Sequence, residues 1–267
     1  MKSSTSAKRF VQKLENKYYD LFSLHEFESS KSLKAAFILV LIHFSFALKD
    51  WFFKPIATVQ EEAANATLCW PHFQSCYKLN VLDFINYGFS HTYLYTALFT
   101  CLILAFVFVA RKNWVYAHLF TSILFLWRFL YFFVVTYKIP AGYEYYSQPF
   151  AFILLFASNK LFLMRFCLAF LYFLSAQVKF YESWIVGTYF TSTHLGMPLF
   201  SDSLAPLATN LVILLEIFGS WALMLPRKKY FPWLLGLWIL FHIYSVTIVG
   251  FNYPFYSALA LGTFWAG

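Results

Sequence analysis

The sequence contains few charged residues, and acidic residues are especially scarce. Only 12% of its 267 residues are charged, with 12 Asp and Glu against 20 Lys and Arg. A soluble domain has about a quarter of its residues charged. Hydrophobic residues make up 61% of the chain, and several apolar runs approach the roughly 20 residues that cross a hydrocarbon core. The composition therefore predicts an all-α, polytopic integral membrane helix bundle with about seven or eight membrane segments.

Several functional motifs are also absent. The sequence has no glycine-rich phosphate loop, no Ser-His-Asp spacing and no zinc-binding helix motif. The net charge of +8 comes from short basic clusters between apolar runs, and no basic face with stacking aromatics is present, which excludes nucleic-acid binding. The polar N-terminal stretch contains no short apolar core before a cleavage site, so the first span is expected to act as its own signal.

Residues 1–33 form a separate, more polar segment. Apolar residues recur there at near-helical spacing, and the basic residues are Lys2, Lys8, Arg9, Lys13 and Lys17. This pattern predicts an amphipathic helix on the inner membrane surface, with a partly ordered polar tail as the alternative. Residues 34–267 form the predicted transmembrane domain.

The apolar runs predict the positions of the membrane segments. The expected segments are 33–53, 90–110, 114–137, 147–159, 161–181, 207–225 and 231–250. A last apolar stretch after Pro254 would form a short eighth segment. The run 149–181 is divided because Ser158-Asn159-Lys160 interrupts it. This division also places the basic clusters on the side of the N-terminus. We therefore expect a cytoplasmic N-terminus, in a bacterial inner membrane or a eukaryotic endomembrane.

Lys179 ends one of these apolar segments, and Gln177, Glu182 and Trp184 are close to it in sequence. Ionisable residues inside membranes are costly and often functional. Burial disfavours an ammonium group, which would make the Lys179 amine a base near neutral pH. The alternative is that Lys179 snorkels to the outer surface, with Glu182 as a solvated partner.

Three further polar residues lie inside predicted spans. Glu216 is expected to face the bundle and to pair with Lys179, Arg128 or His242, or to be protonated; a structural interhelical hydrogen bond is the alternative. His242 is a candidate for proton relay or for binding a quinone carbonyl, or else a structural histidine. Arg128 is expected to pair with Glu216, to hold an anionic head group or to have a structural role.

Cys69 and Cys76 share a predicted outer loop, which favours an extracytoplasmic disulfide between them. Cys69, His72 and Cys76 would supply only three ligands of a zinc site, so we expect no metal.

An ordered set of residues suggests a family. Arg165 is followed by an aromatic-rich helix, and Lys179 then stands five residues before Trp184 and eight before Gly187. His194 follows in a loop, and FHIYSVTIVGFNY supplies His242, Gly250, Phe251 and Tyr253. In this order the chain resembles the membrane domain of the vitamin K-dependent gamma-carboxylases and the related horizontally transferred transmembrane (HTTM) domains, over roughly residues 76–267.

The resemblance implies a chemistry for these residues. The matching lysine in the carboxylases deprotonates vitamin K hydroquinone, and the oxygenated product then removes a proton from a glutamate side chain before carbon dioxide adds. It implies catalytic roles here for Lys179, His242 and His194, and places Trp184 and Tyr253 in a substrate or cofactor pocket. The positions of the other polar residues in or beside apolar runs add Glu216 to the candidate catalytic residues, and Gln177 and Arg128 to the candidate pocket. The chain departs from the family in lacking a histidine around 145–147 and the large lumenal region.

These observations lead to three alternative hypotheses for the function. The first is a carboxylase-like lyase that uses reduced vitamin K or another quinone and acts on a peptide or protein. The second is a non-catalytic membrane factor for the export, maturation or immunity of a small peptide. The third is a lipid or quinone carrier. Fold alone does not choose among them.

Overall fold

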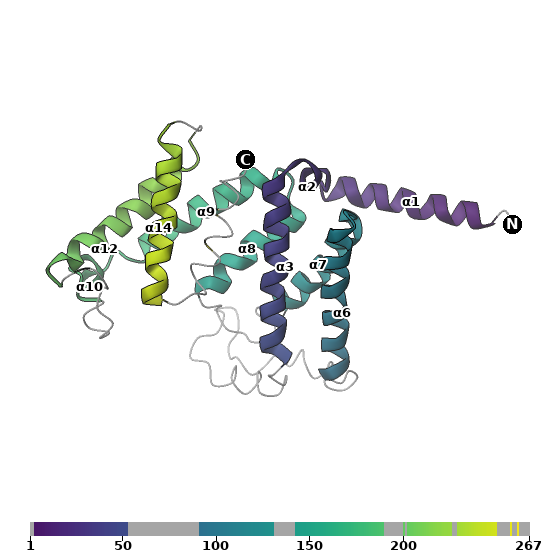
Figure 1. The fold of residues 1–267 in the computed structure, drawn as a ribbon, viewed down its shortest axis with the longest axis horizontal. Coiled ribbons are helices and arrows are strands. Elements are labelled where there is room, and N and C mark those ends of the chain that lie inside the picture. Colours follow the sequence, from purple (N-terminus) through teal and green to yellow (C-terminus); the bar gives the residue numbers. More distant parts are fainter. Residues whose placement is uncertain are drawn as a thin grey trace, which may run out of the picture. The chain divides into compact units, whose positions relative to one another are not determined.

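The computed structural model describes residues 3–52, 91–130, 142–189, 200, 202–225, 229–249, 257 and 261. These residues form helices and connecting turns, with no strand among them (Figure 1). The all-α prediction is confirmed for this part of the chain. The chain divides into two compact units, Met1–Ser158 and Asn159–Gly267, which are described separately.

The first unit begins with three consecutive helices. These are α1 (Ser3–Leu21), α2 (His25–Ser29) and α3 (Lys31–Phe52). Ser23 has a positive φ of 49° and separates α1 from α2. The Ser30 hydroxyl accepts a hydrogen bond from the Leu33 N–H at 3.3 Å, which caps the start of α3. The predicted amphipathic segment is therefore helical over most of its length.

The rest of the described first unit is a helical hairpin and one further helix. It consists of α6 (His91–Ala110) and α7 (Trp114–Leu130), which pack side by side, and α8 (Gly142–Phe156) packs against α7. The Asn113 side chain caps α7 by accepting the Tyr116 N–H at 3.3 Å. Trp114 stacks on Phe27, with ring centroids 5.4 Å apart. The start of α7 therefore packs on the α2 region through aromatic contacts.

The second unit has shorter and less regular helices. Asn159 has a left-handed backbone with φ 55°, so α8 ends before it and α9 (Lys160–Gln177) begins after it. The break lies at the interruption from which the sequence predicted two segments. The remaining elements are α10 (Glu182–Ile185), η2 (Asp202–Leu204), α12 (Ala205–Leu214), the π-helical turn η3 (Leu215–Gly219), α13 (Ser220–Ala222) and α14 (Phe231–Val249).

Five helical stretches are long and apolar enough to cross a membrane. They are Lys31–Leu48, Tyr93–Ala110, Lys160–Gln177, Asp202–Ala222 and Phe231–Ile248. Two shorter apolar helices cover Trp114–Leu130 and Ser147–Phe156. A helix thus lies in each predicted range between residues 33 and 250, and the predicted segment after Pro254 lies outside the described residues except for Ser257 and Leu261. Large apolar side chains are exposed along these helices, as expected for surfaces that face lipid.

Candidate functional site

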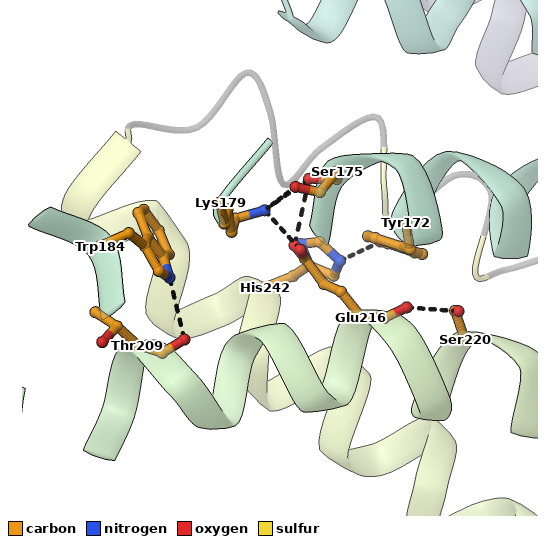
Figure 2. A network of polar contacts seen from close by, with 8 residues as sticks. All are labelled: Tyr172, Ser175, Lys179, Trp184, Thr209, Glu216, Ser220 and His242. Atoms are coloured by element: carbon orange, nitrogen blue, oxygen red, sulfur yellow. Dashed lines mark hydrogen bonds and ion pairs between the residues drawn. The ribbon is translucent and has the colours of Figure 1, made fainter. Parts of the chain in front are cut away.

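One face of α9 carries the polar residues of the candidate site. Tyr172, Ser175 and Lys179 are three and four residues apart, a spacing that places them on the same side of a helix. Lys179 lies two residues after Gln177, the last residue of α9, and its backbone N–H donates to the Ala176 carbonyl at 3.0 Å. The turn after the helix therefore keeps the lysine in line with the other two (Figure 2).

Lys179 and Glu216 form an ion pair inside the second unit. The Lys179 Nζ donates to Glu216 Oε2 at 2.6 Å, to Ser175 Oγ at 2.7 Å and to the Ser175 carbonyl at 3.1 Å. The lysine side chain is 14% exposed and the glutamate side chain 1%. Lys179 therefore turns toward Glu216, whereas Glu182, the alternative solvated partner, is exposed.

Ser175 connects the two charged groups. Its hydroxyl accepts from Lys179 and donates to Glu216 Oε1 at 3.5 Å, so both oxygens of the carboxylate have a contact from the α9 side. An ammonium group has three hydrogens, and each one has an acceptor here. The carboxylate therefore has the counter-ion and hydrogen-bond donor that a buried charge requires.

Glu216 lies in the π-helical turn η3. Such wide turns are rare, and they occur frequently at functional sites within helices. The Ser220 hydroxyl donates to the Glu216 backbone carbonyl at 2.6 Å, so this carbonyl remains hydrogen-bonded at the irregular turn. The turn places Glu216 opposite α9, with which η3 is in contact.

Aromatic side chains lie beside the ammonium group. The Lys179 Nζ is 5.5 Å from the centroid of the Trp184 ring, within the range of a cation–π contact. The Trp184 indole N–H donates to the Thr209 carbonyl at 3.1 Å (Figure 2). The Tyr189 ring is 5.3 Å from Trp184 and 6.1 Å from Tyr181, centroid to centroid. Tyr181 and Tyr189 are exposed, so this aromatic cluster is open on one side.

The backbone conformation at position 187 requires glycine. Its φ is +77°, and a Cβ added there would lie 2.6 Å from the Pro206 nitrogen and 2.8 Å from the Ala205 carbonyl carbon. Lys179, Trp184 and Gly187 each contact the single helical run Asp202–Ala222. Their spacing of five and eight residues thus corresponds to three contacts along one neighbouring helix.

His242 contacts the same face of α9, through Tyr172. It is buried in α14, and its Nε2 is hydrogen-bonded to the Tyr172 hydroxyl. The Tyr172 and Trp238 ring centroids are 4.1 Å apart. Tyr172 and Ser175 were not predicted as site residues. Their spacing from Lys179 along one helix face is the signal that would have identified them.

Of the other predicted site residues, the structure describes Gln177 and Arg128. The Gln177 side chain is exposed. Arg128 is buried in the first unit, where its guanidinium carbon is 5.9 Å from the Phe44 ring centroid, and the Glu216 carboxylate pairs with Lys179 instead. The remaining predictions concern residues outside the described ones: His194, Tyr253, Cys69 and Cys76. Within the described ranges, no three His, Cys, Asp or Glu side chains gather where a metal would bind.

Comparison with known proteins gives no match. No protein-family model, no curated protein and no solved structure matches the chain. The gamma-carboxylase resemblance accordingly depends on the ordered residues between Arg165 and Tyr253, and the chemistry that it implies for this chain is a proposal.

Proposed function

We propose that the chain is an integral membrane protein with seven helical segments, and that Lys179 and Glu216 form a proton-transfer site for a lipid-soluble hydroquinone. The observation that carries the proposal is the buried ion pair itself, whose lysine remains partly exposed while its glutamate is covered. An approaching substrate reaches the ammonium group first and the carboxylate only through it. The gamma-carboxylase resemblance supplies the substrate class.

The residues of the pair have different roles in this proposal. Lys179 takes the proton from a substrate hydroxyl while it passes one of its own protons to Glu216 Oε2, across the 2.6 Å hydrogen bond. The substrate O–H bond breaks and a Glu216 O–H bond forms, and the ammonium group remains as the counter-ion of the substrate oxygen. The bond from Lys179 to the Ser175 carbonyl is the longest of its three, so it is the one that a substrate oxygen replaces.

The surroundings of Lys179 suit a quinone ring. Trp184, Tyr189 and Tyr181 form a partly exposed aromatic cluster beside the ammonium group, and flat aromatic ligands stack on such side chains. A bound hydroquinone would supply an acidic phenolic hydroxyl, with dioxygen as the oxidant. Tyr172 and Ser175 keep their face of α9 in register with α14 and η3 through their bonds to His242 and Glu216.

A non-catalytic membrane factor is the second candidate, and one observation favours it. All three hydrogens of the Lys179 ammonium group already have acceptors within the protein. On this alternative the ion pair serves only to join α9 to the Asp202–Ala222 run. The protein would then act through a partner, such as a small peptide, and not through proton transfer.

The test measures oxygen uptake by the purified full chain in nanodiscs supplied with a 1,4-naphthohydroquinone. Two variants separate chemistry from structure. Lys179→Arg keeps a cation that stays protonated, and the double variant Lys179→Met with Glu216→Leu replaces the pair by apolar groups, which buried sites often tolerate. We expect uptake above that of empty nanodiscs for the wild type, and a fall of about a hundredfold in both variants.

Lys229→Met provides the matched control, because Lys229 is exposed and lies before α14. It should leave oxygen uptake unchanged. Wild-type uptake at the level of empty nanodiscs, or full uptake by the folded double variant, would refute the enzyme. In the second case the membrane-factor alternative predicts that a peptide partner co-purifies with the wild type and with the double variant alike.

A further inference from the structure

The helix α1 differs from all the apolar helices in its charge. Within Ser3–Leu21 it carries four basic and two acidic residues. Its apolar residues Phe10, Leu14 and Leu21 recur at spacings of four and seven, which place them on one stripe of the helix. They are 64%, 51% and 67% exposed. Such a stripe on a charged helix needs an apolar surface to cover it.

A different side of the α1 region packs on α7 and α8 of the same unit. The Tyr18 hydroxyl is hydrogen-bonded to His118 Nδ1 at 2.7 Å, and the Phe22 ring lies 4.8 Å from the His118 ring, centroid to centroid. Because the Leu155 carbonyl can only accept, His118 Nε2 donates to it at 2.7 Å, and Nδ1 of the neutral ring accepts from Tyr18. Burial raises the pKa of Tyr18, which keeps this hydroxyl protonated as a donor.

This docking places α1 at the end of the first unit. Tyr116, in the first turn of α7, donates its hydroxyl hydrogen to Glu15 Oε1. Figure 1 shows α1 running crosswise to α3 and α6, past the end of the bundle where α3 begins. The turn between α6 and α7 carries the exposed residues Arg111 and Lys112. Basic residues at the ends of apolar helices lie at the level of lipid head groups.

Two basic residues border the exposed stripe beside Phe10 and Leu14. Lys13 and Lys17, one helical turn apart, lie along the edge of the stripe formed by Phe10 and Leu14, and both are exposed. Gln12 and Asn16 are exposed on the side away from the stripe. An apolar stripe with a basic border fits the boundary between acyl chains and anionic head groups, where the lysines meet phosphates and the apolar side chains enter the lipid.

We infer that α1 is an in-plane helix that binds the anionic lipid of the membrane in which the bundle sits, with Phe10, Leu14 and Leu21 inserted and Lys13 and Lys17 on the phosphates. The inference depends on the membrane insertion in the proposed function, but not on the chemistry of Lys179. The Tyr18 and Glu15 contacts fix the rotation of α1 about its axis and leave Phe10, Leu14 and Leu21 exposed to the surroundings.

The experiment uses the full chain in nanodiscs of phosphatidylcholine, with or without phosphatidylglycerol. An environment-sensitive fluorescent amino acid is incorporated at Leu14 or, as the matched control, at Asn16, and quenching by a nitroxide-labelled lipid is measured. We expect strong quenching at position 14 in the anionic nanodiscs and little at position 16. The double variant K13Q/K17Q is expected to lower association of α1 with the anionic surface roughly thirtyfold.

Equal quenching at positions 14 and 16, or none at either, would overturn the inference. Quenching at position 14 that is the same with and without phosphatidylglycerol, and the same in K13Q/K17Q as in the wild type, would also overturn it. Failure of the chain to enter nanodiscs would instead refute membrane insertion. Hydroquinone-dependent oxygen uptake by K13Q/K17Q should equal that of the wild type. A result on α1 is therefore independent of a result on Lys179 and Glu216.

Discussion

Two sets of buried polar groups, one in each unit of the chain, are satisfied in different ways. In the first unit, long regular helices bury His118 and Thr121, and each is satisfied by a nearby hydroxyl or backbone carbonyl: His118 by Tyr18 and Leu155, and Thr121 by Ala117. In the second unit, the buried carboxylate of Glu216 pairs with Lys179 across 37 residues of sequence. The first arrangement needs only neutral hydrogen bonds, whereas the second requires two opposite charges to meet through tertiary packing.

The second unit also has irregular backbone near the candidate site. A left-handed Asn159 begins α9, a positive-φ Gly187 ends α10 and a π turn holds Glu216. Irregular turns of this kind persist where the surrounding structure fixes them, and they are common at functional sites. The candidate chemistry is therefore located where the helices depart from regular geometry. Three substitutions test this contrast.

Lys179→Ala should have the largest effect on stability. It leaves the Glu216 carboxylate buried without its counter-ion, which costs about 3–5 kcal/mol. Lys179→Met combined with Glu216→Leu removes both charges, and this double variant should unfold at a temperature close to that of the wild type. Thermal unfolding in detergent measures the difference. If the single variant Lys179→Ala is as stable as the double variant, the ion pair contributes nothing to the stability of the second unit.

Gly187→Ala should have the next largest effect. Its left-handed φ and the approach of the Pro206 backbone together predict a loss of about 2–4 kcal/mol in unfolding free energy. Gly236→Ala is the matched control, because a Cβ there meets nothing within 4 Å. In the interior of α14 it should stabilise the protein by up to about 1 kcal/mol. Equal effects of the two substitutions would contradict the close packing of Gly187 on α12.

Tyr18→Phe should have the smallest effect, confined to the first unit. It removes one hydrogen bond to His118, worth about 1 kcal/mol. Amide hydrogen exchange should quicken in α1 while α7 keeps its protection. Tyr93→Phe, at an exposed tyrosine of α6, is the control and should change nothing in α1. Faster exchange throughout the first unit would show that the bond supports the whole unit and not the docking of α1.

The helices themselves could be predicted because their signals are local. Apolar runs bounded by basic or helix-breaking residues located α3, α6 and α14, and Ser158-Asn159-Lys160 marked the break before α9. The ionisable residues Lys179 and Glu216 stood out because charges inside apolar runs are rare. The roles of Tyr172 and Ser175 were not predicted, since a hydroxyl on an apolar helix acquires a role only from the helix packed against it.

The amino-acid order alone predicted that the described residues are helical. It also predicted which helices are long and apolar enough to cross a membrane. Both properties depend on residues that are neighbours in the chain. The pairing of Lys179 with Glu216, 37 positions away, in place of Glu182, three positions away, arises only in the folded chain. It depends on the packing of α9 against a π turn and on the approach of Gly187 to Pro206. These contacts join residues distant in sequence, and no local pattern specifies them.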